Sequence, residues 1–188
     1  NSNYTIEGTN YSHKFTITPK PITINWSGTS GLIYDSTVQK ISAASSDIIP
    51  GDTVNYTITY TAGDGRNAGS HTAIVEIDNN NYTIAANETV SYRIEPKEIT
   101  IEWTNLEFTY EEGKTYCPTA TAKGLLGDDT CELIVEGAAS AVGKHTATVT
   151  DISNKNYKLP ANTSTTFEII QTIPTTTLTV TIYGNVTI

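Results

Sequence analysis

A repeat of about 75 to 77 residues is the feature that most limits how this chain can fold. An Asn-Tyr pair, a Tyr-Arg-Ile-Glu-Pro-Lys run and an Ile-Thr-Ile-Glu-Trp run follow one another between Asn81 and Trp103. The same order occurs between Asn3 and Trp26, and its first two parts return, in looser form, between Asn156 and Ile169. The chain therefore contains copies of one folding unit.

Further matches fix the register of the copies. They are Tyr34-Asp35 with Tyr110-Glu111, Gly51-Asp52 with Gly127-Asp128, and Gly69-Ser70-His71 with Gly143-Lys144-His145. The register predicts two complete repeats, at residues 19–95 and 96–171. Residues 1–18 are interpreted as the terminal strands of a preceding repeat. Residues 172–188 are interpreted as Thr-rich strands that start a further repeat or form an edge. Because an initiator Met and a signal peptide are both lacking, we expect a piece of a longer protein.

The residues inside each copy favour β-strands. The chain holds 22 Ile, 9 Val and 34 Thr against 7 Leu, and β-branched side chains suit pleated strands better than helices. Apolar residues alternate with polar ones, as in Ile22-Thr23-Ile24-Asn25-Trp26, and Gly-, Asn- and Asp-rich turns separate these runs. The prediction is an all-β protein of tandem small antiparallel β-sandwiches, immunoglobulin-like in architecture, joined end to end through Pro-Lys pairs at 19–20 and 96–97.

Charge and hydropathy exclude several partners. The net charge of −9 speaks against nucleic acid, whose phosphates need clustered Lys and Arg. No apolar run approaches the roughly 18 residues of a membrane span, so we expect no membrane insertion.

The motifs resemble those of MBG/YDG-type repeats of bacterial cell-surface, adhesin-like proteins. The resemblance covers nearly the whole chain, and the Phe/Tyr-x-Ile-x-Pro-Lys joint is its most specific part. It differs in detail, because Tyr34-Asp35-Ser36 and Tyr110-Glu111-Glu112 stand where relatives have Tyr-Asp-Gly. The resemblance implies immunoglobulin-like repeats in a secreted or wall-anchored bacterial protein, and it brings no catalytic or ligand-contact residue.

Cys117 and Cys131 flank the turn at Gly127-Asp128 in the second repeat. When the two repeats are aligned by their alternation of apolar and polar residues, Cys131 takes the position of Val54, and Cys117 lies near the position of Ile41. Two facing core positions changed to Cys together predict a disulfide in an oxidising compartment. The alternative is two independent buried thiols. A metal site is not expected, because two Cys fall short of the four ligands of a structural zinc site.

The other candidates for chemistry have simple structural interpretations. His71 and His145 occupy equivalent positions, and a repeated position favours a framework role; His13 is interpreted as an edge or core-rim residue. Glu111-Glu112 and Asp128-Asp129 are adjacent pairs whose members point to opposite faces of a strand. We therefore predict no enzyme activity and no cofactor. A Lys-to-Asn isopeptide bond starting from Lys20 or Lys97 is an open alternative.

The function predicted from the sequence is a stalk or spacer that presents a distal adhesive domain outside the cell, with neighbouring repeats of the same polypeptide as partners. One alternative is a module that binds a host glycan or host protein, with Tyr11, Tyr116 and Tyr183 as its best exposed aromatic candidates. A second alternative is a strand-exchanging subunit of a surface filament, because the flanks at 1–18 and 172–188 would leave strand edges to be covered.

Overall fold

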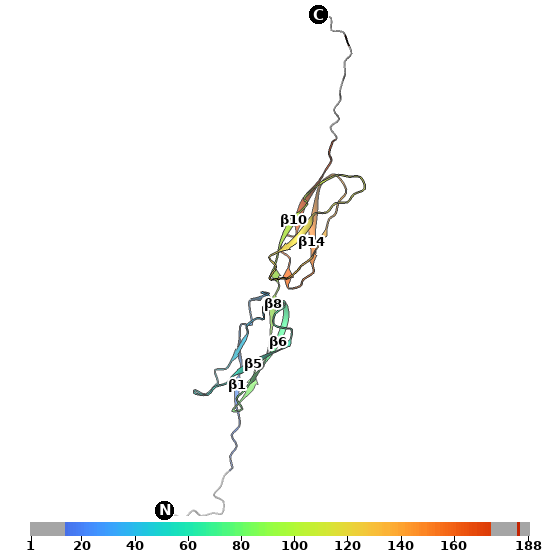
Figure 1. The fold of residues 1–188 in the computed structure, drawn as a ribbon. Helices are drawn as coiled ribbons and strands as arrows, with labels where there is room; N and C mark the ends of the chain where they lie inside the picture. The colour runs from blue at the N-terminus through green and yellow to red at the C-terminus, as the bar shows by residue number, and fades with distance from the viewer. Residues whose placement is uncertain (1–13, 174–183, 185–188) are drawn as a thin grey trace, which may run out of the picture. The chain divides into compact units, whose positions relative to one another are not determined.

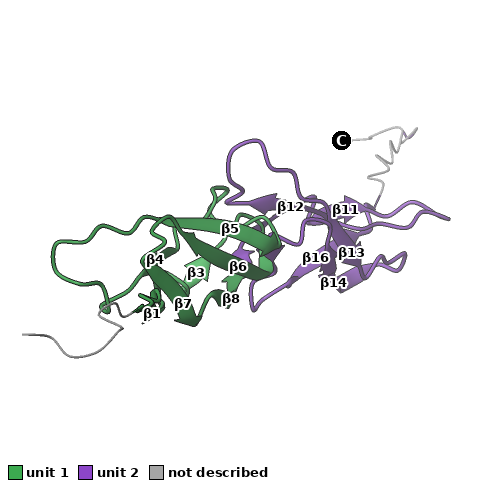
Figure 2. Ribbon diagram, turned by 90° about the horizontal axis from the view of Figure 1, so that it is seen from below, with its two compact units in different colours: residues 1–95 green, residues 96–188 purple. Residues whose placement is uncertain are grey.

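A computed structural model describes residues 14–173 and 184 of the chain (Figure 1). Their secondary structure consists of β-strands, which confirms the predicted all-β class. No helix among these residues is long and apolar enough to cross a membrane. The chain divides into two compact units, unit 1 up to Glu95 and unit 2 from Pro96 (Figure 2).

From Lys14 to Glu95, the described part of unit 1, the chain forms eight strands in three small sheets. They are β1 (Lys20–Thr23), β2 (Asn25–Ser27), β3 (Leu32–Ile33), β4 (Ser42–Ala44), β5 (Tyr56–Ala62), β6 (Gly69–Ile77), β7 (Tyr82–Ala86) and β8 (Thr89–Glu95). The largest sheet has the order β3-β8-β6-β5, and β1 pairs with β7 while β2 pairs with β4.

Unit 2 repeats this arrangement. Its strands are β9 (Lys97–Glu98), β10 (Thr100–Thr104), β11 (Glu107–Thr109), β12 (Thr119–Lys123), β13 (Leu133–Glu136), β14 (Gly143–Ile152), β15 (Tyr157–Lys158) and β16 (Ser164–Ile170). The four-stranded sheet has the order β11-β16-β14-β13, with β9 on β15 and β10 on β12. The two units thus have the same strand order, in a fold consistent with an immunoglobulin-like sandwich.

Each unit contains parallel as well as antiparallel strand pairs, which corrects the prediction of antiparallel sheets. In unit 1, β1 runs parallel to β7 and β3 parallel to β8. In unit 2, β9 runs parallel to β15 and β11 parallel to β16. These pairs form between strands that are distant in sequence, so no hairpin turn marks them in the sequence.

Each unit has its own core. Ile22, Ile24, Val75 and Tyr82 are buried together in unit 1, whereas Ala147, Phe167 and Ile169 are buried together in unit 2. Trp26 and Trp103 pack half-buried against these two clusters. The alternation seen in the sequence therefore does mark the faces that become buried.

Separate cores predict separate losses of stability. Ile169 is fully buried, so Ile169→Ala should destabilise unit 2 by about 2–5 kcal/mol and leave unit 1 unchanged. Hydrogen exchange followed through a denaturant series resolves the two units. The matched control is Thr166→Ala, at an exposed position of the same strand, which should cost less than about 0.5 kcal/mol. If Ile169→Ala lowered the stability of both units equally, the two cores would not be independent.

Candidate functional site

The predicted disulfide between Cys117 and Cys131 is not present. Both cysteines are free, and both are half-buried. The Sγ of Cys131 lies 4.0 Å from the carbonyl oxygen of its neighbour Glu132. Strand pairing explains the correction. Trp26 pairs with Ala43 in unit 1, and Trp103 pairs with Ala120 in unit 2.

By this register the buried position of Ile41 belongs to Pro118 in unit 2, which is also buried. Cys117 instead corresponds to Lys40, an exposed residue. Because neighbouring residues of an extended chain point to opposite sides, a one-residue offset turns Cys117 away from the predicted core position.

The two histidines of the Gly-x-His matches make the same hydrogen bond. His71 Nε2 lies 2.7 Å from the carbonyl oxygen of Asn67, and His145 Nε2 lies 2.6 Å from that of Ala141. A carbonyl oxygen only accepts, so Nε2 carries a proton in both rings. In unit 1 the N–H of Gly65 also donates to His71 Nδ1 at 3.1 Å. Both nitrogens of His71 are therefore engaged in holding the loop before β6.

Acidic side chains near the same end of unit 1 bind their own loops. Asp35 accepts hydrogen bonds from the amide and hydroxyl of Thr37 and from the Gln39 side chain, all at 2.8 Å. The Thr37 donors are the main cause that lowers the pKa of Asp35. Asp64 accepts from the amides of Asn67 and Arg66 at 2.9 Å, and these two bonds lower its pKa. Each carboxylate thus stabilises one turn.

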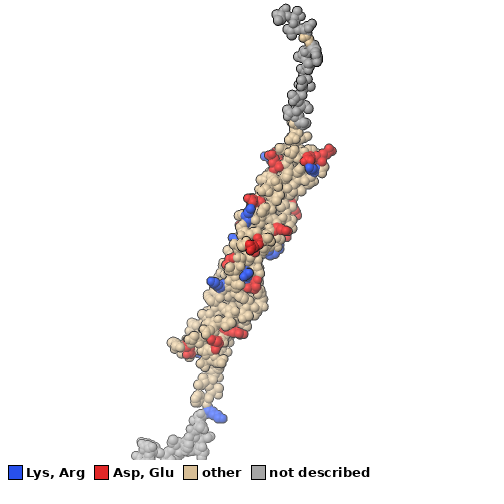
Figure 3. Space-filling view, in the orientation of Figure 1, with Lys and Arg blue, Asp and Glu red and all other residues tan. Residues whose placement is uncertain are grey.

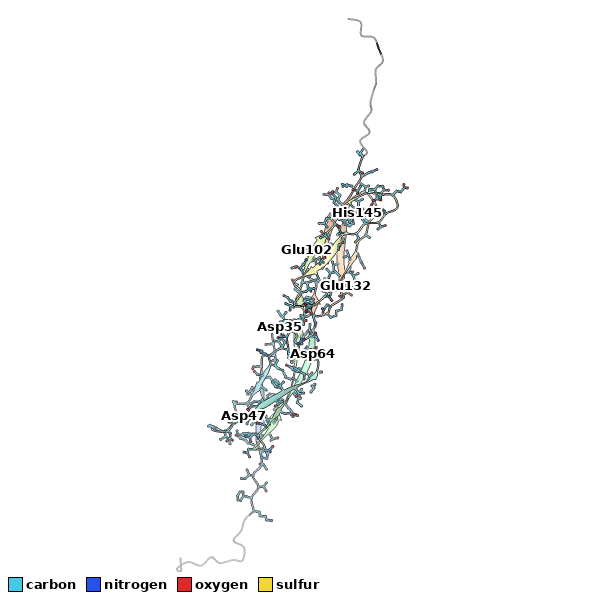
Figure 4. All side chains as sticks on the ribbon, viewed as in Figure 1. Asp35, Asp47, Asp64, Glu102, Glu132 and His145 are labelled. Atoms are coloured by element: carbon cyan, nitrogen blue, oxygen red, sulfur yellow. The ribbon has the colours of Figure 1, made fainter. Side chains whose placement is uncertain are left out.

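The labelled acidic side chains and His145 do not converge on a common point within either unit (Figure 4). In unit 1, Asp47 lies at the opposite end from Asp35 and Asp64. The described residues contain no group of three or more His, Cys, Asp or Glu side chains arranged to hold a metal ion.

A tyrosine–aspartate clip occurs at the same place in both units. In unit 1, the hydroxyl of Tyr82 donates to Asp52 Oδ2 at 2.5 Å and accepts from the amide of Ile49 at 3.1 Å. In unit 2, the hydroxyl of Tyr157 donates to Asp129 Oδ2 at 2.5 Å and accepts from the amide of Leu126 at 2.9 Å. The hydrogen bond to Asp52, helped by desolvation, raises the pKa of Tyr82.

Each clip fixes a turn onto the start of a strand. The amide of Asp52 donates to the Ile49 carbonyl, and that of Asp129 to the Leu126 carbonyl, both at 3.0 Å. The aspartate that corresponds to Asp52 is therefore Asp129, one residue beyond the Gly127-Asp128 match made from the sequence.

An asparagine adds a second repeated contact beside each clip. The side-chain oxygen of Asn79 accepts from the amide of Asn81, and its NH₂ donates to the Thr53 carbonyl. Asn154 does the same with Asn156 and Thr130. Both asparagines lie in Asn-rich turns, and this hydrogen bond from the turn to a distant segment was not predicted from the sequence. Their shared place before an Asn-Tyr pair was the available signal.

The aromatic residues proposed for ligand stacking are already engaged where the structure describes them. The Tyr116 hydroxyl donates to the Thr109 carbonyl and accepts from the Glu111 amide, both at 2.8 Å. Tyr11, Tyr183 and His13 lie outside the described residues. Lys20, one isopeptide candidate, is exposed and its ammonium group contacts the Asp47 carbonyl oxygen.

Surface charges are mixed rather than gathered by sign. On the face shown in Figure 3, Lys and Arg side chains lie among Asp and Glu in both units. The ion pair of Lys123 with Glu102, at 2.8 Å, joins side chains that are about half exposed. Such pairs contribute little to stability.

Comparison with family models, with curated proteins and with solved structures found no match for this chain. The features that recur in both units are contacts that hold loops and terminal strands in place.

The clips predict local effects. Tyr82→Phe should speed exchange of the Ile49 amide about fivefold to tenfold, since that amide loses its acceptor, while the Leu126 amide stays unchanged. Tyr157→Phe should give the reverse, so each variant is the control for the other. Amide exchange by NMR measures both. Unchanged exchange at Ile49 in Tyr82→Phe would show that the hydroxyl does not hold this turn.

A second pair of variants tests a buried hydroxyl. Tyr92 is 7% exposed, and its hydroxyl has no hydrogen-bond partner among the described residues. Desolvation is the main cause that raises the pKa of Tyr92 to about 12. The equivalent residue of unit 2, Phe167, lacks the hydroxyl.

Tyr92→Phe should therefore stabilise unit 1 at neutral pH. An unfolded tyrosine ionises near pH 10, so the contribution of neutral Tyr92 is full below about pH 10 and is lost as pH rises to about 12. This alkaline loss should become smaller in Tyr92→Phe, where Tyr82 with its raised pKa still contributes, and it should increase in unit 2 with Phe167→Tyr. Urea denaturation at pH 8 and pH 11, with each unit followed by hydrogen exchange, measures both effects. An identical alkaline loss in Tyr92→Phe would exclude Tyr92 as its source.

Proposed function

We propose that this chain is a load-bearing spacer from an extracellular bacterial surface protein, whose repeats follow one another end to end and hold an adhesive domain away from the cell. The observation that carries the proposal is the way the first and last strands of each unit are bonded. In both units the first strand runs parallel to a strand near the end of the unit, and the last strand lies inside the four-stranded sheet.

The first strand and the last strand of unit 1, β1 and β8, lie toward opposite ends of the unit (Figure 1). Lys20, at the start of β1, pairs with Tyr82 at the start of β7. From Tyr82 the chain continues through β7 and β8 to Glu95, a stretch of at most about 45 Å. Unit 2 has the same relation, because Lys97 pairs with Tyr157 and the chain continues to Ile170.

Tension between these two ends acts along the strands. Pulling on Lys20 draws β1 past β7, so that bonds such as Lys20 N–H to Asn81 O at 2.8 Å and Ile24 N–H to Ala86 O at 3.1 Å are loaded together. Pulling on Glu95 draws β8 past β3 and β6, its two hydrogen-bonded neighbours. Bonds loaded together must break together, whereas bonds at the open end of a hairpin break one after another. This difference favours a role in carrying force.

The connection between the units supports the end-to-end part of the proposal. Pro96 is the single residue between β8 and β9, and proline fixes its own φ and restricts the residue before it. Lys97 follows Pro96 directly, and its amide already donates a hydrogen bond to the Asn156 carbonyl of unit 2 at 2.9 Å. A connection of one restricted residue leaves little chain to act as a flexible hinge.

Single-molecule force spectroscopy tests this function. Pulled from its two termini, the chain should show two discrete unfolding events. Their forces should exceed the force needed to separate Thr57 from Glu76, directly paired residues of β5 and β6, through cysteines introduced there in a Cys117→Ser, Cys131→Ser background. Equal forces in the two pulling directions would contradict a load-bearing design.

A matched pair of variants localises the resistance. Lys20→Pro removes the β1 donor in unit 1, and Lys97→Pro removes its counterpart in unit 2. Each should lower the force of its own unit only, because forced unfolding follows the barrier crossed along the pulling direction. Loss of force in both units from either variant would show that the contact acts globally.

A further inference from the structure

The segment from Lys14 to Thr18 carries the sequence pattern of the last strand of each unit. Phe15-Thr16-Ile17-Thr18 precedes Pro19-Lys20, as Tyr92-Arg93-Ile94-Glu95 precedes Pro96-Lys97. In unit 2 the corresponding residues are Phe167-Glu168-Ile169-Ile170. The aromatic residue and the isoleucine lie two positions apart, so they share one face of a strand.

These two positions are among the most buried in each unit, but not in this segment. Tyr92 and Ile94 are 7% and 0% exposed, and Phe167 and Ile169 are 1% and 0% exposed. Phe15 and Ile17 are 83% and 85% exposed. The segment thus presents the apolar face of a central strand without the sheet that such a face packs against in units 1 and 2.

We propose that Lys14–Thr18 is the central strand of a further sheet of this type, and that its partner is a unit of the same kind that lacks its own last strand. The inference rests on the proposed function, because a spacer is built of adjoining units, and it names the partner of this surface. Units 1 and 2 are not that partner, since β8 and β16 already occupy the position in each.

Strand pairing specifies what the partner must contain. Tyr92 pairs with His71 and Phe167 pairs with His145, with ring centroids 5.3 Å and 5.6 Å apart. The isoleucines pair with Gly69 and Gly143, two residues before each histidine. The partner strand should therefore carry Gly-x-His, with the histidine opposite Phe15 and the glycine opposite Ile17.

The other side of the segment should meet a short parallel strand. Leu32 pairs with Ile94, and the amide of Tyr34 donates to the Glu95 carbonyl at 2.9 Å. Phe108 pairs with Ile169, and the amide of Tyr110 donates to the Ile170 carbonyl at 2.8 Å. By the same register, the Thr18 carbonyl should accept a hydrogen bond from the backbone amide of the tyrosine in a Tyr-Asp or Tyr-Glu pair of the partner.

The chain supplies its own test. A copy of residues 19–78 placed before Asn1 provides every strand of unit 1 up to β6, and the match of Asn81-Tyr82 with Asn3-Tyr4 sets the junction. The complete native chain follows the added copy. We expect the copy to fold and the amides of residues 15–18 to exchange about a hundredfold more slowly than in the native chain. Contacts between the Phe15 ring and the histidine of the copy should appear by NMR.

Two controls separate the outcomes. Phe15→Ser with Ile17→Ser should leave the added copy unfolded and units 1 and 2 unchanged. A longer copy, residues 19–95, brings its own last strand and should fold while residues 15–18 stay open to exchange. If the longer copy folds and the shorter one does not, the inference is wrong, while the force measurements on units 1 and 2 are unaffected.

The native chain provides a third result. Concentration-dependent association in sedimentation, abolished by Phe15→Ser with Ile17→Ser, would assign this surface to a second copy of the chain and overturn the inference. We expect no such association.

Discussion

The last strand of each unit is an internal strand of its main sheet, and the rest of the fold depends on this placement. β8 lies between β3 and β6, and β16 lies between β11 and β14. Its alternation buries Tyr92 and Ile94 in unit 1 and Phe167 and Ile169 in unit 2. A unit therefore cannot close its sheet or its core until the end of its own segment is in place. This makes each unit a cooperative piece of about 75 residues rather than a set of separable hairpins.

The parallel pairs follow from the same placement. The chain passes directly from β7 to β8, through Asn87 and Glu88, and so moves from one sheet to another while keeping its direction. β7 pairs with β1 and β8 pairs with β3. A strand pair joined by a hairpin must be antiparallel, but pairs between the two ends of a unit are free of that restriction. With the parallel pairs, tension applied to the two ends of a unit would act along its first and last strands.

Sequence reasoning recovered the strands better than their register. Alternation in Ile22-Thr23-Ile24 marked a real strand, because one side of the strand is buried and the period of two is strong. The boundary after Glu95 coincides with the division into compact units. Positions in turns were less certain, since turns tolerate insertions and have no burial period. This is why Asp128 was matched in place of Asp129, and Cys117 in place of Pro118.

The candidate site could be predicted only in part. A Tyr–Asp hydrogen bond across about 30 residues leaves no local sequence pattern, although both tyrosines and Asp52 were already among the repeated residues. The parallel pairs were not predicted for the same reason, since their register depends on contacts distant in sequence. The repeat itself is clear in the sequence, and it indicates which positions of the two units should make equivalent contacts.

Comparison of the two units separates what the fold requires from what it tolerates. Around His71, unit 1 has a polar network. The Tyr60 hydroxyl donates to the Gln39 carbonyl at 3.1 Å, and the Gln39 amide donates to the Gly65 carbonyl at 2.8 Å. Around His145, unit 2 instead has an aromatic group in which Phe108 contacts Tyr116 and Phe167. The side chains at this end of the core therefore differ between two units of the same fold.

The clips at Tyr82 and Tyr157 are the same in both units. They lie where the first strand of each unit begins, since Lys20 and Lys97 pair with these tyrosines. A fold that varies its core but keeps the attachment of its first strand is what the proposed spacer function would require, because the ends of a spacer must hold under tension whichever side chains fill its core.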